Sequence, residues 1–349
     1  MKPYEDHIGL WADELKSWVP DTIFDAHVHL GPPEAVGKIT TARQKEPLTT
    51  FRSFTWEKAS AFYKNLYSGK EIVGLIAFGF PLREVKLEVA NQYIIHLMQD
   101  NPFIKGFVIS DPKDTERTIH NFEKALKAGV RFSGVKPYFD LLGKSNYETT
   151  MPEFIPNDLL EFMNSEELVM MLHTSGIGMG DYENQQFIKS VANDFPHINI
   201  VLAHMGRYLE LKQFFDFIES DVMDYPSVFL EMSTATKKEV YQRVLARKEL
   251  WGRLLFGSDL PYGLITGVER WSKETGPIFI TRDQYSWSDS SLNEYSSNMR
   301  DRLTYNTYHT IKALKDAVDS LNLAPDNAEQ LKRKIFLENA RYGLFDNKA

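Results

Sequence analysis

The sequence predicts an α/β protein folded as a distorted (β/α)8 barrel, and three observations lead to this fold class. Eight short apolar runs, rich in β-branched and aromatic residues, recur along the chain. Several of these runs are apolar without interruption, as expected of parallel strands that are covered on both faces. Helical patterns separate most of them, and a repeated strand–helix unit is typical of a TIM barrel with its site at the C-terminal mouth.

The predicted strands are Thr22–Leu30, Ile72–Phe80, Ile104–Ser110, Ser133–Phe139, Leu168–His173, Ile198–His204, Val228–Met232 and Arg253–Asp259. Helical patterns between them include Val85–Gln99, Thr115–Ala128 and Asn184–Asp194. An open doubly wound sheet is the alternative, but no glycine-rich phosphate loop follows the first strand.

Helices are also expected at both ends of the chain. Apolar residues from Ile8 to Trp18 recur at helical spacing, and Pro20 ends this helix, which we expect to pack outside the barrel. The tail, Arg300–Phe345, is interpreted as two helices, with Pro325 near the start of the second.

Two segments are too long for plain connections, and both follow a strand. The first is Gly31–Lys70, and the second begins after Asp259. They are interpreted as extra helices and long loops that roof the C-terminal mouth, and the alternative is that their aromatic residues form a small separate core. These aromatic residues are Phe51, Phe54, Trp56, Phe62, Tyr63, Tyr67, Tyr262, Trp271, Tyr285, Trp287 and Tyr295.

Composition restricts the class of protein. The 349 residues are 43% hydrophobic and carry a net charge of −8, so a sizeable core is expected in one domain, 1–349, with a barrel core of about 22–345. The negative charge argues against nucleic acid or an anionic membrane as partner. No run is long enough to span a bilayer, and the N-terminus lacks the apolar block of a signal peptide, so a cytoplasmic location is expected. A homodimer is left open.

Histidines concentrate where a barrel carries its site. His27 and His29 lie two apart on the first predicted strand, so their side chains point to the same face. His173 and His204 end the fifth and sixth strands, and Asp259 ends the eighth. Four of nine histidines at strand ends is a concentration that scattered structural histidines do not explain.

These residue types predict a metal centre. The chain has no cysteine, so any metal must be held by His, Asp or Glu. Imidazoles and a carboxylate suit Zn²⁺, with ligands His27, His29, His173 and Asp259 and an open position for water or substrate. Asp259 is also the expected proton relay. His204 is expected to bind a second metal, polarise a substrate carbonyl or move a proton.

Other strand-end residues carry weaker expectations. Lys136 is expected to be carboxylated, to bind a substrate carboxylate or to pair with Glu231, which is interpreted as structural. Asp25 is expected to orient a ligand, and Gly257 to leave the interior open beneath Asp259. Candidate contacts to an anionic small-molecule substrate are Lys136, Arg207, Arg83, Tyr138 and Tyr262.

Five segments of the chain resemble the amidohydrolase-related branch of the amidohydrolase superfamily. They are Phe24-Asp25-Ala26-His27-Val28-His29, Leu172-His173-Thr174, Ala203-His204-Met205-Gly206, Phe256-Gly257-Ser258-Asp259-Leu260-Pro261 and Glu338-Asn339-Ala340-Arg341-Tyr342-Gly343-Leu344-Phe345. The resemblance spans about Thr22 to Phe345. It implies a distorted TIM barrel with one Zn²⁺ in most members, the four ligands named above, and His204 as the catalytic histidine.

The resemblance also narrows the alternatives. A lysine at the position of Lys136 is usually not a ligand in this branch, so a two-metal site is not favoured. A nucleoside deaminase is disfavoured because no glutamate follows His173 within a few residues. The two long segments lie outside the common core of the family, so the resemblance does not extend to the substrate.

Three functions follow as expectations. The first is a metal-dependent hydrolase that uses activated water on an amide, ester or lactone carbonyl. The second, represented in this branch by aminocarboxymuconate-semialdehyde decarboxylase, is a non-oxidative decarboxylase of a small aromatic or unsaturated acid. The third is a non-catalytic metal-binding barrel. The same residues serve the first two chemistries, so the fold alone does not decide between them.

Overall fold

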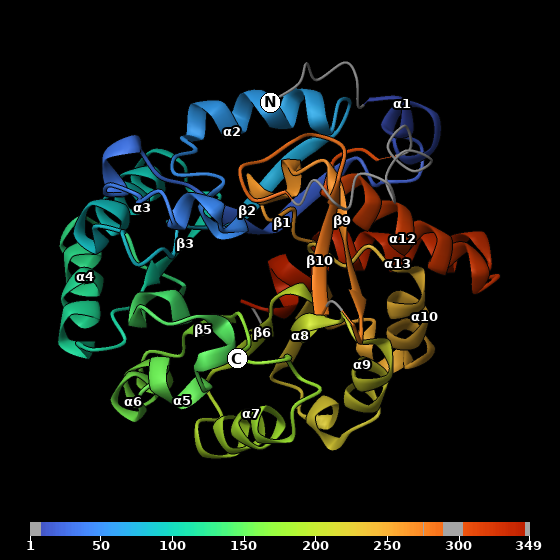
Figure 1. Ribbon diagram of the computed structural model, residues 1–349. Helices are drawn as coiled ribbons and strands as arrows, with labels where there is room; N and C mark the ends of the chain where they lie inside the picture. The colour runs from blue at the N-terminus through green and yellow to red at the C-terminus, as the bar shows by residue number, and fades with distance from the viewer. Residues whose placement is uncertain (1–7, 275, 289–302, 346–349) are drawn as a thin grey trace.

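Eight parallel strands form the centre of the computed structural model, which describes residues 8–274, 276–288 and 303–345 (Figure 1). They lie in the sheet in their sequence order, as predicted for a (β/α)8 barrel. The strands are β1 (Thr22–His29), β2 (Glu71–Phe78), β3 (Ile104–Ile109), β4 (Gly134–Lys136), β5 (Val169–Leu172), β6 (Asn199–Leu202), β7 (Val228–Glu231) and β8 (Leu254–Leu255).

Two backbone hydrogen bonds nearly close the barrel between its first and last strands. The Ala26 amide donates to the Phe256 carbonyl at 2.9 Å, and the His29 amide donates to the Leu260 carbonyl at 2.7 Å. Because both bonds involve residues that follow β8, the segment leading to Asp259 is held against the strand that carries His27 and His29.

All eight predicted strands are present, but each predicted C-terminal end lies one to four residues beyond the observed one. Within the predicted strand Arg253–Asp259 the observed strand covers Leu254–Leu255, and within the predicted strand Ser133–Phe139 it covers Gly134–Lys136. Both segments stop pairing with the neighbouring strand where they reach the mouth of the barrel. Asp259 itself adopts φ +53°, which is incompatible with a β-strand.

Helices surround the sheet. The α-helices are α1 (Ile8–Leu10), α2 (Trp56–Leu66), α3 (Leu87–Asp100), α4 (Thr115–Lys127), α5 (Met151–Phe154), α6 (Asn157–Ser165), α7 (Tyr182–Asp194), α8 (His204–Arg207), α9 (Leu211–Ile218), α10 (Lys238–Ala246), α12 (Asn306–Ser320) and α13 (Pro325–Arg333). The π-helices are η2 (Trp11–Leu15) and η13 (Lys334–Gly343). The 3-10 turns are η3 (Pro33–Ala35), η4 (Arg43–Lys45), η5 (Pro47–Thr49), η6 (Phe139–Leu142), η7 (Asn146–Glu148), η8 (Asp221–Asp224), η9 (Lys248–Leu250) and η10 (Tyr262–Leu264). Among the residues described here, no helix has both the length and the apolar character needed to cross a membrane.

The helix predictions are confirmed to within a few residues at their ends. The predicted N-terminal helix divides into α1 and η2, and Trp11 of η2 is buried against Tyr67 and Tyr308. The predicted tail appears as α12 and as α13 continued by η13, although its first residues, 300–302, lie outside the described residues.

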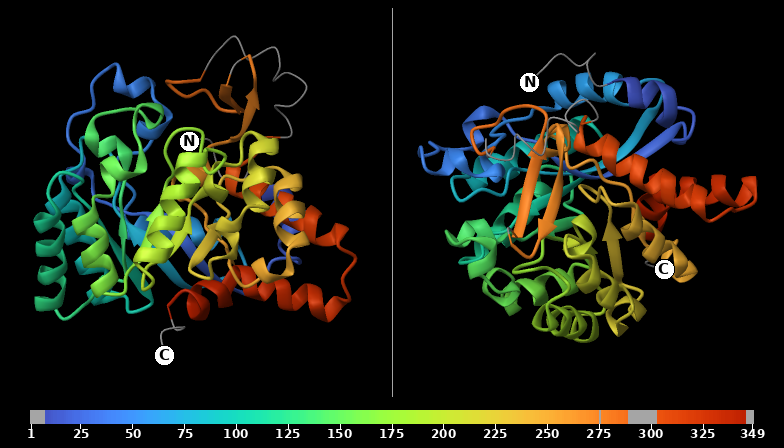
Figure 2. Two further views of the ribbon diagram at one scale, coloured as in Figure 1. Left: turned by 90° about the horizontal axis from the view of Figure 1, so that it is seen from below. Right: turned by 45° about the vertical axis from the view of Figure 1, so that its right-hand side comes forward.

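Alternation along the strands divides the core into two clusters. Leu75 and Ala77 of β2 pack outward under the helices, whereas Ile76 and Phe78 face the barrel interior. Leu337 and Ala340 of η13 join the interior cluster, and Figure 2 shows the C-terminal helical segment at one end of the barrel. In the described chain this segment therefore covers the end of the barrel opposite the C-terminal mouth.

Helix α2 agrees with the extra helices expected in the two long segments, whereas the hairpin after β8 was not predicted. Helix α2 lies within Gly31–Lys70, and an antiparallel hairpin follows β8, formed by β9 (Gly267–Ser272) and β10 (Gly276–Thr281). In Figure 2 the hairpin lies at the opposite end of the barrel from the C-terminal segment. Many of the predicted aromatic residues pack against one another, as Trp287 does on Tyr285, while Tyr295 lies outside the described residues.

Gly257 occupies the closure between β1, β7 and β8. A Cβ atom at this position would lie 2.2 Å from Glu231 Oε1 and 2.8 Å from His27 Cβ. The expectation that Gly257 leaves open space is therefore wrong, because the side chains of Glu231 and His27 fill that space.

We expect Gly257→Ala to lower the free energy of unfolding by about 1–3 kcal/mol, because the added methyl overpacks a filled site. Urea denaturation would measure the loss. The control is Gly252→Ala, where a Cβ meets nothing within 4 Å. Equal stability of both variants would show that the closure tolerates a side chain.

Candidate active site

A cavity of about 600 Å³ opens at the C-terminal ends of the strands. It is lined by strand-end residues, by Glu46, Pro47 and Leu48 from the first long segment, and by the second long segment. The expectation that both segments reach the mouth agrees with this lining. The sequence-predicted residues on the cavity wall are His27, His29, Arg83, Lys136, Tyr138, His173, His204, Arg207, Asp259 and Tyr262.

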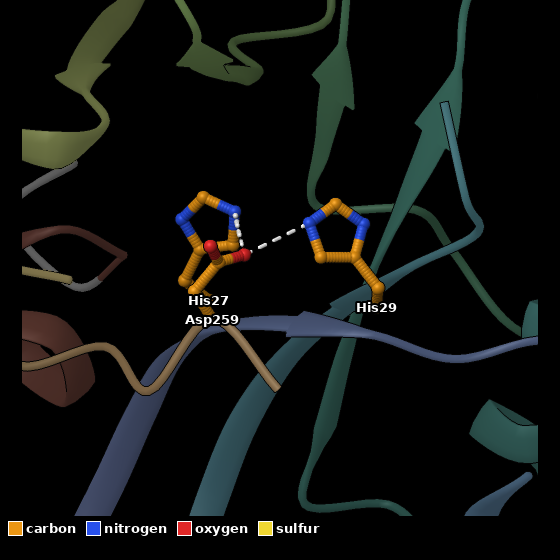
Figure 3. Close-up of side chains that lie close together, drawn as sticks. All are labelled: His27, His29 and Asp259. Carbon is orange, nitrogen blue, oxygen red and sulfur yellow. Dashed lines mark ion pairs between the residues drawn. The ribbon is translucent and has the colours of Figure 1, made fainter. Parts of the chain in front are cut away.

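Three of these residues converge on one point, as Figure 3 shows. Asp259 Oδ1 lies 3.1 Å from His29 Nε2 and 3.4 Å from His27 Nε2. The three ligand atoms all lie within 4.8 Å of one another, and all three residues are buried. This arrangement brings together, in space, residues that are 230 positions apart in the sequence.

Each histidine of this group directs its other nitrogen to an acceptor. His27 Nδ1 lies 2.9 Å from Glu231 Oε2, and His29 Nδ1 lies 3.1 Å from the Gly79 carbonyl. Because these acceptors require a proton on Nδ1, each Nε2 is left with a free lone pair. This is the tautomer that a metal-binding imidazole needs.

The protonation states of His27, His29 and Asp259 would allow a cation to bind between them. Burial lowers the pKa of His29 to about 3 and that of His27 well below its ordinary value, so both rings are neutral at pH 7. Burial raises the pKa of Asp259 to about 7, and His27 Nε2 and Asp259 Oδ1 are buried without a hydrogen-bond partner. A divalent ion would satisfy these orphaned atoms, so the residues present fit a metal.

Glu231 links the two halves of the site. Besides the His27 ring, its Oε2 accepts from Ser233 Oγ at 2.8 Å and from the His204 amide at 3.3 Å. His204 Nδ1 lies 2.9 Å from Ser233 Oγ, which leaves His204 Nε2 facing the cavity. The ligand atoms of Glu231, His27 and His204 also lie close together, but we interpret this group as a hydrogen-bond network.

Asp25 supports both ligand segments through the backbone. Its Oδ1 accepts from the amides of His27 at 3.2 Å and Ser258 at 2.8 Å, and its Oδ2 accepts from the Tyr63 hydroxyl at 2.7 Å. The carboxylate thus fixes the backbone at His27 and beside Asp259, which agrees with the expectation that Asp25 orients a ligand.

His173 lies in the same cavity but apart from the three converging atoms. Its ring centroid is 5.3 Å from that of His204, and its Nδ1 lies 3.0 Å from the Thr174 carbonyl. Among the described residues, the groups of ligand atoms within 4.8 Å of one another do not include His173.

Lys136 and Tyr138 contribute polar groups that form no hydrogen bond or ion pair with the residues the structure describes. Burial lowers the pKa of Lys136 to about 8, although Asp259 and Glu231 oppose this shift. Its ammonium lies 4.9 Å from the Phe78 ring centroid, and within the described chain it forms no ion pair with Glu231 or any other carboxylate. Burial also raises the pKa of Tyr138, so its hydroxyl stays protonated.

The two predicted arginines differ in whether a carboxylate neutralises their charge. Arg83 donates to Asp140 Oδ1 at 2.6 Å, so its charge is paired. Arg207 donates to the Gly176 carbonyl at 2.8 Å and to the Tyr147 hydroxyl at 3.1 Å, both neutral acceptors. The Tyr262 hydroxyl donates a hydrogen bond to the Leu48 carbonyl at 2.6 Å.

Sequence reasoning missed several residues around the cavity. Arg43 donates to Glu84, Glu46 and Asp140, and this network ties the segments that follow β1, β2 and β4. Glu269 lines the cavity from the second long segment, and Asn306 lines it from the start of α12 in the tail. No signal in the sequence marked these residues, because they stand outside strand ends and their partners are far along the chain.

Similar structures agree with this fold. The 2,6-dihydroxybenzoate decarboxylase from Rhizobium superposes with a TM-score of 0.55 at 14% identity, covering 95% of this chain and 100% of that chain. The 4-oxalomesaconate hydratase from Rhodopseudomonas palustris gives 0.52 at 16% identity, covering 93% and 95%. A Pseudomonas putida protein assigned as a 2-pyrone-4,6-dicarboxylic acid hydrolase gives 0.50 at 16% identity, covering 95% and 100%. At these identities the likeness establishes the fold alone.

No curated protein matches the chain. A family model does match: residues 82–342 fit the model of the amidohydrolase family Amidohydro_2, described as amidohydrolase, which accounts for most of the chain. With the barrel and the buried His27, His29 and Asp259 group already in place, this match shows that the chain belongs to that amidohydrolase family.

Proposed function

We propose that the protein is a mononuclear zinc-dependent hydrolase that acts on an amide, ester or lactone carbonyl of a small anionic substrate. The observation that carries the proposal is the convergence of His27, His29 and Asp259 at the base of the cavity, with two buried atoms left without partners. Family membership supports the proposal but leaves the reaction type open.

The ligand atoms we propose are Nε2 of His27, Nε2 of His29 and an oxygen of Asp259. His173 is proposed to complete the set, because the bond to the Thr174 carbonyl leaves its Nε2 free. Neutral imidazoles with a carboxylate and no thiolate suit Zn²⁺. When bound, the ion supplies Lewis-acid chemistry, acidifying water and polarising a carbonyl.

The proposed proton path uses the chain's own groups. As water adds to the carbonyl carbon, Asp259 accepts its proton and later delivers that proton to the departing nitrogen or oxygen. His204 is held by Ser233 with Nε2 toward the cavity, and burial lowers its pKa to about 4. It is therefore a neutral acceptor at pH 7, suited to orienting the water or taking up a proton.

Two cationic side chains, Lys136 and Arg207, support the proposal that the substrate is anionic. The ammonium of Lys136 is buried beside the ligand group without a hydrogen-bonding partner in the described chain, and a substrate carboxylate would compensate its desolvation. Arg207 is partly exposed in the same cavity, and its guanidinium donates to two neutral acceptors in the described chain. A carboxylate on the substrate would therefore be held by at least one of them.

A decarboxylase of a small aromatic or unsaturated acid is the second candidate. The fold likeness to 2,6-dihydroxybenzoate decarboxylase favours it, as does the ammonium of Lys136, which could hold a carboxylate near the metal. CO₂ release from a panel of aromatic acids, measured beside hydrolysis of anilides, aryl esters and lactones, separates the two reactions.

We expect Asp259→Ala to lower hydrolytic turnover of the zinc-loaded protein about 10²–10⁴-fold, because the variant loses a ligand and the proton relay. Turnover of the panel above measures the loss. Asp216→Ala is the control, since Asp216 is exposed and pairs with Lys212 on α9, away from the cavity lining. Full turnover by Asp259→Ala would defeat the proposed mechanism.

Zinc binding should release protons in a pH-dependent way. Because the pKa of metal-free Asp259 is about 7, the ion must displace its proton at pH 6 but not at pH 8.5, so apparent affinity falls as the pH drops below 7. Calorimetry in buffers of different ionisation enthalpy should show about one more proton released at pH 6. In Asp259→Asn this difference should vanish, and its persistence would point to a different titrating group.

Glu231→Gln should weaken zinc binding about 10–100-fold, because the amide cannot accept all the hydrogen bonds that orient the His27 ring. Competition with a chelator at pH 7.5 measures the affinity. The matched control is Glu249→Gln, on an exposed residue paired with Arg247. Unchanged affinity in Glu231→Gln would mean that the His27 ring is oriented by other contacts.

A further inference from the structure

The hairpin that follows β8 presents one polar and one aromatic side chain to the cavity. Glu269 of β9 and Phe279 of β10 are direct cross-strand partners, so their side chains project from the same face of the hairpin. Both residues line the cavity. In Figure 2 the hairpin lies at the end of the barrel opposite the C-terminal segment, above the C-terminal ends of the strands, so these two side chains belong to the cavity wall that the hairpin contributes.

The Glu269 carboxyl has no partner in the described part of the chain. It forms no hydrogen bond there and no ion pair within 4.0 Å, although it is partly buried. Arg207 does not serve it, because that guanidinium is directed to the Gly176 carbonyl and the Tyr147 hydroxyl. Burial raises the pKa of Glu269 to about 7 despite the opposing charge of Arg207.

Asn306 adds a second unused acceptor close by. Its Nδ2 donates to the Gly267 carbonyl at 3.1 Å, which fixes the amide orientation because a carbonyl can only accept. Its Oδ1 is buried, has no hydrogen-bond partner and belongs to a residue that is 2% exposed. Gly267 and Glu269 are two residues apart on one strand face, about 7 Å along it.

We propose that Glu269 and Asn306, with Phe279 beside them, form a distal acceptor site for a hydroxyl or amine that the substrate carries at the end remote from its reacting carbonyl. This inference rests on the proposed function, which sets the reacting end at the His27 group. It narrows the substrate class to a small carboxylate-containing compound with a remote hydrogen-bond donor.

The expected preference for a ligand with a hydrogen-bond donor follows from the free-energy cost of leaving buried acceptors without a hydrogen bond. A ligand that fills this end with a methyl group leaves two desolvated acceptors without donors, whereas a hydroxyl donates to one of them and an ammonium can donate to both. Phe279 provides an apolar wall, and its ring face also attracts an ammonium. The donor need not be charged, so hydroxyl and amine compounds are tested separately.

The experiment measures ligand binding to the zinc-loaded protein by calorimetry, without turnover. The probes are 4-methylbenzoate, 4-(hydroxymethyl)benzoate and 4-(aminomethyl)benzoate, together with the 3-phenylpropionates that bear the same substituents, so that two spans are covered. We expect at least one donor compound to bind about tenfold or more tightly than its methyl counterpart. Equal binding within both series, or no binding by any probe, would overturn the proposal.

Glu269→Gln tests the assignment to this residue. The substitution keeps the shape of the side chain but removes its charge and one acceptor oxygen, so we expect the preference for the donor compound to fall about tenfold. Glu274→Gln is the control, because Glu274 belongs to the same hairpin and is exposed. An unchanged preference in Glu269→Gln would overturn the proposal. A preserved preference in wild-type protein that hydrolyses nothing would support this site while the proposed hydrolysis fails.

Discussion

The buried carboxylate of Glu231 is the constraint on which the site depends. A charge without solvent is tolerated only when its oxygens accept enough hydrogen bonds, and Glu231 receives them from the His27 ring, from Ser233 and from the His204 amide. The same bonds set which nitrogen of His27 faces Asp259, and through Ser233 they set the His204 ring. Gly257 belongs to this constraint, because a side chain there would displace the carboxylate.

Backbone strain accumulates around the same residues. His204, Met205, Gly206 and Arg207 have φ between +54° and +68°, so the short helix α8 is a left-handed turn, and Asp259 has φ +53°. Such conformations cost about 1–2 kcal/mol for each residue other than glycine. The turn persists because its neighbours hold it, for example through the Met179 amide bonded to the Gly206 carbonyl. Its effect is to direct both His204 and Arg207 into one cavity, which supports a functional reading of the strain.

Topology explains how much of this could be predicted from the sequence. Because parallel strands share one C-terminal edge, polar residues at strand ends could be expected to meet, and His27, His29, His204 and Asp259 do so. The strand ends themselves could not be predicted, since the apolar pattern continues past the point where pairing stops. The sequence could not predict the roles of Glu269, Asn306 and the Arg43 network. These roles depend on a hairpin and on ion pairs between distant segments, and neither leaves a periodic signal in the sequence. The position of His173 relative to the ligand group depends on the β5 loop, which spacing alone does not determine.

The ligand set does not distinguish hydrolysis from decarboxylation, and we base the proposed preference for hydrolysis on the supply of protons. Decarboxylation needs a group that is protonated at neutral pH and can deliver its proton to carbon. His204, with a pKa of about 4, is neutral, and Asp259 facing a bound cation would be ionised, so both are proton acceptors. The ammonium of Lys136, with a pKa of about 8, is a donor near them, and it lies beside aromatic rings. If a substrate carboxylate engages Lys136, the ammonium is held in its charged form and gives up its proton less readily. His204 and Asp259 would accept a proton, and the donor Lys136 would be held in its charged form. This arrangement favours removing a proton from water over adding a proton to carbon, and for that reason we propose hydrolysis ahead of decarboxylation.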